Sequence, residues 1–224
     1  MQAIGPLGHT HRVETGAENR PETTGETGNG RGVHAFIDLR SPYSCLAITP
    51  FRDAMRNAGA RVTWHPFAID IEATYGAPGS RSPREERKTK YLYMDVRRIA
   101  AGRGLVIRGP LRIYGAALAH MGLVFAREHG ILDAYVDAIY ARFFSRAIDI
   151  ERPDEVAAAV AAAGGDAEAF LAYLDDQGPA ELDRETRFAE ELGVFGVPTF
   201  VRAGELFWGL DRIPLLASRI VAAD

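Results

Sequence analysis

An apolar run at residues 33–39, followed at once by the turn Ser41-Pro42-Tyr43-Ser44, most constrains how this chain can fold. The run has the length of a buried strand, and apolar residues at helical spacing predict a helix over residues 44–58. A second strand is predicted at residues 61–67. Two strands joined by a helix form a right-handed unit in which the strands are parallel.

The pattern changes twice in the rest of the chain. Residues 68–84, with several Gly and Pro, predict a loop, whereas residues 85–193 are helical almost throughout. Helices are predicted at 86–103, 113–129, 131–145, 153–163, 166–176 and 179–193. Two short strands follow at 199–203 and 205–208, and a last helix begins at Asp211.

This order predicts an α/β protein with a thioredoxin-like fold, in which a β-α-β half and a β-β-α half flank an inserted all-helical domain. We assign residues 33–67 and 194–224 to the thioredoxin-like domain and residues 85–193 to the inserted helical domain. Residues 1–32 are rich in Gly, Thr and Glu and are nearly without apolar residues after Val13. This composition predicts a disordered tail.

The bulk properties exclude several classes of protein. A net charge of −4 gives no argument for nucleic-acid binding, and no apolar run reaches the ~18 residues of a membrane span. The N-terminus lacks the basic and apolar regions of a secretory signal, and a single cysteine, Cys45, rules out an intrachain disulfide. We therefore expect a cytoplasmic protein that binds a small molecule and neither nucleic acid nor membrane. The scattered histidines predict no metal site.

Ser41 is the first candidate for chemistry, because it is predicted at the start of a helix. Free N–H groups and the helix dipole favour negative charge there. A free thiol titrates near ~8.5, so a hydroxyl donor at this place would help to populate the thiolate of a bound ligand such as glutathione. The alternative is a plain helix cap, with Pro42 at the first helical position. The two roles are compatible.

Val197-Pro198 and Asp211 are the second and third candidates. A proline just before a strand is a candidate for a cis peptide bond, and the residue before it could offer its main chain to an extended peptide such as glutathione. Asp211 could bind the ammonium of a γ-glutamyl group. An ordinary loop proline and an ordinary helix cap are the alternatives.

The stretch 81–98 carries seven basic and three acidic residues and could bind the carboxylates of a small anionic ligand. A solvated helix face is the alternative for most of these residues. Cys45 follows Ser44 directly, but it falls on the apolar stripe of the helix and is predicted to be part of the core.

Four motifs, taken together, resemble those of 2-hydroxychromene-2-carboxylate isomerases and are similar to those of kappa-class glutathione transferases, relatives in the DsbA-like branch. They are Ser41-Pro42-Tyr43-Ser44, Lys90 with Tyr91-Leu92-Tyr93-Met94-Asp95, Gly193-Val194-Phe195-Gly196-Val197-Pro198-Thr199, and Phe207-Trp208-Gly209-Leu210-Asp211-Arg212. The resemblance covers about residues 33–222. It implies a thioredoxin fold with an inserted helical domain, glutathione as cofactor, and often a homodimer.

The resemblance also implies roles for individual residues. Ser41 would be catalytic and would stabilise the glutathione thiolate. The glutathione-binding residues would be Ser41, Tyr43, Val197, Pro198, Leu210 and Asp211. The anionic substrate, or the glycine carboxylate of glutathione, would be held by Arg84, Lys90 and Arg112. The implied reaction is reversible addition of the thiolate to a conjugated carbon, opening of the chromene ring, rotation of a bond and departure of the thiolate, which leaves a benzylidenepyruvate.

The chain departs from the family pattern at Leu210, where a small polar residue is usual, and at Arg40, where an apolar residue is common beside Ser41. Leu210 removes one side-chain contact to glutathione, and Arg40 could alter the charge of the pocket. A kappa-like glutathione transferase and a DsbA-like binding protein without catalysis are the alternatives to an isomerase. A thiol-disulfide oxidoreductase is disfavoured, because one cysteine supplies no resolving thiol.

Overall fold

The computed structural model describes residues 32–222 of the chain. Its strands are β1 (Gly32–Ile37), β2 (Arg61–Pro66), β3 (Thr199–Arg202) and β4 (Glu205–Trp208). Its helices are α1 (Pro42–Asn57), α2 (Ile71–Tyr75), α3 (Pro83–Ala101), α4 (Ala117–Glu128), α5 (Leu132–Ser145), α6 (Pro153–Ala162), α7 (Ala167–Asp175), α8 (Gly178–Glu191), the 3-10 turn η1 (Leu210–Arg212) and α9 (Ile213–Val221).

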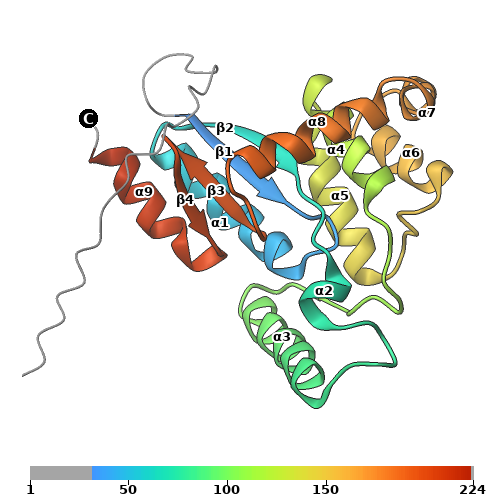
Figure 1. Ribbon diagram of the computed structural model, residues 1–224. Coiled ribbons are helices and arrows are strands. Elements are labelled where there is room, and N and C mark those ends of the chain that lie inside the picture. The colour runs from blue at the N-terminus through green and yellow to red at the C-terminus, as the bar shows by residue number, and fades with distance from the viewer. Residues whose placement is uncertain (1–31, 223–224) are drawn as a thin grey trace, which may run out of the picture.

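The strands form one sheet in the order β2-β1-β3-β4 (Figure 1). β1 pairs with β2 in parallel, and the pairs β1–β3 and β3–β4 are antiparallel. The parallel pair is joined through α1, and the antiparallel pair β3–β4 is followed by α9. These are the β-α-β and β-β-α halves that the sequence predicts, so the predicted α/β class is confirmed.

Successive side chains of β1 point to opposite faces of the sheet, so each face packs against a different set of residues. Val33, Ala35 and Ile37 belong to the larger hydrophobic core, which includes the buried side of α1. Phe36 points to the other face, where it packs in a smaller cluster with Ala189 of α8. Both faces of the sheet are therefore packed against other elements.

The helical segment shares its core with the sheet. One cluster of buried side chains runs from Ile37 and Leu46 to Ile139 of α5 and Val160 of α6. α3 is the exception, because it lies at the lower edge of the molecule in Figure 1 and buries only Leu92, Val96 and Ala100. These three side chains are four residues apart and form one narrow apolar stripe.

A buried polar network fastens α8 and α4 to the sheet. His65 Nδ1 on β2 lies 2.5 Å from Glu185 Oε2 on α8, and Arg127 Nη2 on α4 lies 2.7 Å from Glu185 Oε1. His34 Nδ1 lies 2.9 Å from His65 Nε2. Burial and the neighbouring His65 lower the pKa of His34. The network pairs every charge that it buries, as a buried ion pair requires.

Two features differ most from the sequence predictions. The predicted loop at 68–84 contains the short helix α2, which begins after the capping residue Asp70. The helix predicted from residue 113 begins only at Ala117. The predicted tail at 1–32 lies outside the described residues except for Gly32, which opens β1. Within residues 32–222, no helix is both long and apolar enough to cross a membrane.

Candidate functional site

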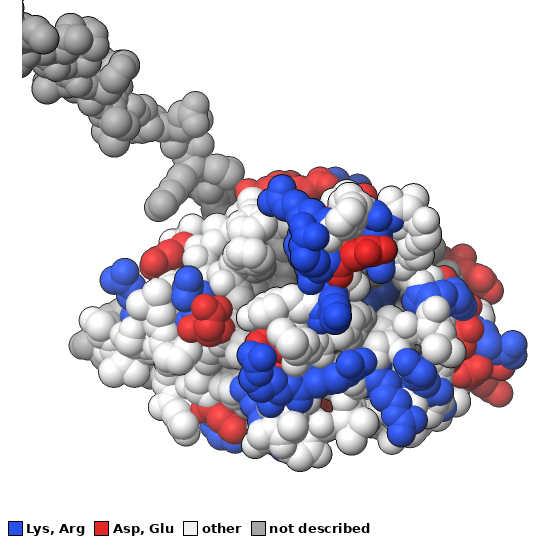
Figure 2. Space-filling model, turned by 90° about the horizontal axis from the view of Figure 1, so that it is seen from below, with Lys and Arg blue, Asp and Glu red and all other residues white. Residues whose placement is uncertain are grey.

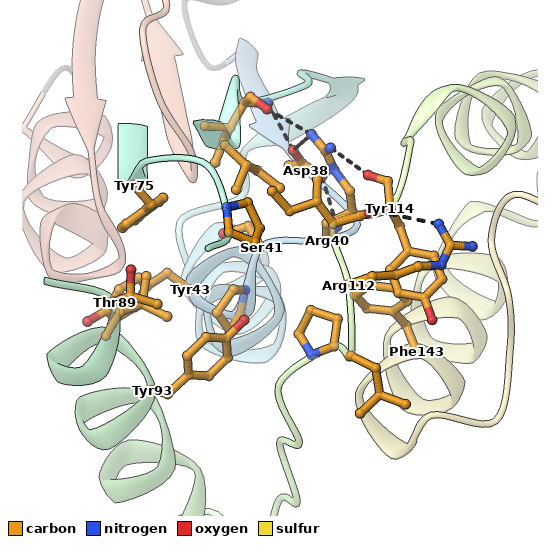
Figure 3. Close-up of a pocket in the computed structure, with 18 of the residues that line it drawn as sticks. Asp38, Arg40, Ser41, Tyr43, Tyr75, Thr89, Tyr93, Arg112, Tyr114 and Phe143 are labelled. Carbon is orange, nitrogen blue, oxygen red and sulfur yellow. Dashed lines mark hydrogen bonds and ion pairs between the residues drawn. The ribbon is translucent and has the colours of Figure 1, made fainter. Parts of the chain in front are cut away.

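A cavity of about 260 Å³ lies where β1 ends and α1 begins. In Figure 3, Ser41 lies between two groups of side chains, with Tyr75 and Thr89 on one side and Arg112, Tyr114 and Phe143 on the other. The aromatic side chains that line the cavity are Tyr43, Tyr75, Tyr93, Tyr114 and Phe143. Aromatic and apolar walls with a few polar groups are typical of small-molecule sites.

Ser41 caps α1 and also borders this cavity. Its Oγ accepts a hydrogen bond from the main-chain N–H of Ser44 at 3.2 Å, and Pro42 takes the first helical position. Within residues 32–222, the Ser41 hydroxyl donates no hydrogen bond, and the main-chain N–H of Tyr43 has no acceptor. The cap and the candidate site therefore coexist, and two donors at the positive end of the helix dipole remain available to an anion.

Val197 lines the same cavity from the start of the chain segment that leads into β3. Its side chain is buried, and the Val197-Pro198 peptide bond is cis. No hydrogen bond from the described residues engages the N–H or C=O of Val197, whereas the Pro198 C=O accepts from the N–H of Gly209 at 2.8 Å. Val197 lines the cavity and Pro198 does not.

Arg40 and Asp38 form a closed charge network at the cavity wall. Arg40 Nη2 donates to Asp38 Oδ2 at 2.7 Å and to the carbonyl of Ile69 at 2.9 Å. Nε donates to Asp38 Oδ1, and Nη1 donates to the carbonyl of Tyr114. Burial alone would raise the pKa of Asp38, but His120 and Arg40 outweigh it and hold this pKa well below its usual range. Arg40 therefore adds no free charge to the cavity, contrary to the expectation from the sequence.

Tyr43 lines the cavity, but its hydroxyl is already engaged. It donates to Asp95 Oδ2 of α3 at 2.9 Å. Burial and this carboxylate raise the pKa of Tyr43, so the phenol stays protonated. The side chain thus ties α1 to α3, and it is the ring of Tyr43 that contributes to the cavity wall.

Leu210 and Asp211 lie in η1, outside the lining of the cavity. Leu210 packs against the larger core, while the side chain of Asp211 is 69% exposed and lies 2.9 Å from Arg212 Nη1. Such exposed pairs are weak, so Arg212 leaves Asp211 accessible to another cation.

The three predicted anion-binding residues are not brought together. Arg84 and Lys90 are exposed on α3 and do not line the cavity. Arg112 lines it, stacks on Tyr114 and pairs with Asp149 at 3.1 Å and with Glu151. Figure 2 shows many Lys and Arg side chains on the face of the molecule seen from below.

The structure adds residues that sequence reasoning missed. Arg81, Thr89 and Tyr93 line the cavity, and Tyr75 enters it from the unpredicted helix α2. A helical reading of α3 places Thr89 and Tyr93 on one face, four residues apart, and this spacing was the available signal. Arg81 is one of seven basic residues in the stretch 81–98, and nothing in the local sequence distinguishes it from the other six.

Two further groups can be assigned. Burial and the nearby Asp137 raise the pKa of Cys45 to about 12, which makes its thiol a poor nucleophile at neutral pH. No group of three or more His, Cys, Asp or Glu side chains among residues 32–222 is arranged to hold a metal ion.

Comparison with known proteins places the fold in a family. The model of the DsbA-like thioredoxin domain matches residues 32–221. The chain belongs to the DsbA-like thioredoxin family. The probable DsbA oxidoreductase of Streptomyces coelicolor superposes with a TM-score of 0.69 at 24% identity, covering 86% of this chain and 89% of that one.

Several relatives of this DsbA-like chain are isomerases by name. The 2-hydroxychromene-2-carboxylate isomerase of Sphingobium xenophagum is 27% identical over 193 residues, which cover 84% of this chain and 97% of the relative. That of Pseudomonas putida is 27% identical over 190 residues, or 83% of this chain and 92% of the relative. A solved 2-hydroxychromene-2-carboxylate isomerase has a TM-score of 0.67 at 26% identity, with coverage of 84% and 94%.

Proposed function

We propose that this protein is a glutathione-dependent isomerase that acts on an aromatic-derived carboxylate, in the manner of a 2-hydroxychromene-2-carboxylate isomerase. One observation carries the proposal: Ser41, whose hydroxyl donates no hydrogen bond within the described residues, and Val197, whose main-chain N–H and C=O are unengaged there, line the same aromatic-lined cavity. The names of the 27% identical relatives agree with it.

The residues present fit glutathione at the two places where it would be held most firmly. Val197 has a free N–H and C=O beside the cavity, which suits the main chain of a cysteinyl unit in an extended peptide. The start of α1 has free donors for a negatively charged sulfur. Asp211, with its weak surface pair, would take the ammonium group of the γ-glutamyl end.

Bound glutathione would supply a thiolate that adds reversibly to a conjugated carbon of the substrate. The Ser41 hydroxyl would donate a hydrogen bond to that sulfur, and the Tyr43 N–H would donate a second one. Both hold the negative charge without moving, because Ser41 is fixed as the cap of α1. The rings of Tyr43, Tyr93 and Tyr114 would orient a planar substrate and exclude water from it.

The test is turnover of 2-hydroxychromene-2-carboxylate by the purified protein with and without reduced glutathione. We expect a benzylidenepyruvate to form only when glutathione is present, and mass spectrometry to recover the glutathione unchanged. A stable glutathione adduct would instead indicate a kappa-like transferase. Failure to turn over the chromene under either condition would contradict the isomerase assignment and favour a binding protein without catalysis.

A further inference from the structure

Three arginines border the cavity, and they differ in what neutralises them. Arg40 is paired with Asp38, and Arg112 is paired with Asp149 and Glu151. Arg81 has no ion pair with any residue that the structure describes. It is therefore the arginine of the cavity lining whose positive charge remains available to a ligand.

Arg81 is also held in place. Its Nε donates to the carbonyls of Tyr75 at 3.0 Å and of Gly76 at 3.1 Å, which fixes the plane of the guanidinium. Its two terminal nitrogens make no hydrogen bond within residues 32–222. A fixed guanidinium with a free edge has the geometry that binds a carboxylate through two parallel hydrogen bonds.

The nearest acidic side chain is committed elsewhere. Glu85 Oε2 accepts from the N–H of Ser82 at 2.7 Å and from its hydroxyl at 2.8 Å, which completes the capping box of α3. These hydrogen bonds are the main reason that the pKa of Glu85 is lowered. Glu85 attracts Arg81 over a longer distance but does not occupy its terminal nitrogens.

Thr89 supplies a second, independent feature of the same cavity. Its Oγ1 is buried and has no hydrogen-bond partner, although the residue lines the cavity. In Figure 3, Thr89 lies on the same side of Ser41 as Tyr75. A buried hydroxyl is normally hydrogen-bonded, so an unpartnered one in a cavity wall points to a ligand that supplies the partner.

We infer that Arg81 and Thr89 form a carboxylate-binding subsite, in which Arg81 pairs with the carboxylate and the Thr89 hydroxyl donates a hydrogen bond to it. The subsite determines specificity for acids over neutral analogues. It takes the role that the sequence suggested for Arg84 and Lys90. The inference deepens the proposed function and rests on it only for the aromatic skeleton of the ligand, for which Tyr75 and Tyr93 provide rings.

Calorimetric titration without glutathione tests the subsite, with 2-hydroxycinnamate and its uncharged amide as probes. We expect the wild type to bind the acid more tightly than the amide. Arg81→Met should weaken binding of the acid about tenfold or more and leave the amide nearly unchanged, because a charged hydrogen bond is lost. Thr89→Val, which keeps the shape of the side chain, should weaken the acid severalfold.

Arg87→Met is the matched control, because Arg87 is an exposed arginine of α3 outside the cavity lining. It should bind both probes as the wild type does. Thr89→Val leaves the hydrogen bonds of the Arg81 loop intact, so it tests the subsite even where Arg81→Met disturbs folding.

The inference is overturned if the wild type shows no preference for the acid, or if both cavity variants bind the acid within twofold of the wild type. Equal weakening of acid and amide would likewise contradict it, since that would indicate a structural role only. Because no glutathione is present, these results are independent of the turnover assay. A failed turnover assay therefore leaves the subsite standing, and a failed subsite leaves glutathione dependence standing.

Discussion

On the side of the cavity formed by β1 and α1, the charged groups are buried and paired, whereas on the side formed by α2 and α3 they are exposed or free. Asp38 and the Arg40 side chain are 1% and 9% exposed and satisfy each other. α3 buries three of its 19 residues, and Arg81 keeps its terminal nitrogens free. The first side can hold a reactive group rigidly, and the second can select what approaches it.

The largest effect on stability should come from breaking the buried ion pair between Arg40 and Asp38. Arg40→Met leaves the buried carboxylate of Asp38 without its cation and frees the carbonyls of Ile69 and Tyr114. We expect a loss of about 3–5 kcal/mol in the free energy of unfolding, measured by urea denaturation. Arg112→Met is the control, because its ion pairs are half-exposed and should contribute less than about 1 kcal/mol. Equal losses would contradict the expectation that a buried ion pair is harder to break than a half-exposed one.

The second largest effect should come from acid, which removes the charge of Asp38 and so lowers the stability of the protein. The pKa of Asp38 is lower in the folded than in the unfolded protein, where it is near ~3.9, so the folded state favours the ionised form. The ionised Asp38 carboxylate therefore makes its full contribution to stability above about pH 3.9, and this contribution is lost as the pH falls below that value. Between pH 6 and pH 3, the melting temperature of Asp38→Asn should fall less than that of the wild type. Asp183→Asn, which changes an exposed carboxylate of α8, should follow the wild type.

Substitutions of Ser41 distinguish its role as the cap of α1 from its proposed role as a hydrogen-bond donor to the glutathione thiolate. Ser41→Ala should lower stability by about 1 kcal/mol, whereas Ser41→Gly should cost only a few tenths, because glycine is tolerated as a helix cap. Both should lower glutathione-dependent turnover about 10- to 100-fold, because both lack the hydroxyl donor. Full turnover in Ser41→Gly would restrict Ser41 to capping.

The smallest effect should come from the tie between the two sides. Tyr43→Phe removes the hydrogen bond to Asp95 Oδ2 and should cost about 1 kcal/mol of stability. Amide hydrogen exchange in α3 should become faster, because α3 loses a link to α1. Tyr91→Phe removes a hydroxyl from an exposed tyrosine of the same helix and should change neither measurement. Unchanged exchange in Tyr43→Phe would mean that packing alone holds the two sides together.

The sequence predicted the elements that depend on local patterns. Apolar spacing gave β1, α1 and β2, and α1 begins at Pro42, two residues before the predicted start of the helix at residue 44. It failed at α2, because the five residues between Asp70 and Gly76 carry too little periodicity to reveal a helix. It also placed anion-binding candidates on Arg84 and Lys90, which lie outside the cavity lining. The resemblance to a family rests on sequence motifs, and these do not show which face of α3 borders the cavity.

What the sequence by itself determined is therefore the order of strands and helices, the start of the helix that presents Ser41, and the proline that follows Val197. Each of these depends on residues that are neighbours in the chain. The tertiary structure alone decided that Arg40 is neutralised, that Arg112 is paired, and that Arg81 and Thr89 share the cavity with Ser41. The physical reason is that charge pairing and burial depend on distances in space. The carbonyls that hold the Arg40 guanidinium against Asp38 belong to residues 29 and 74 positions further along the chain.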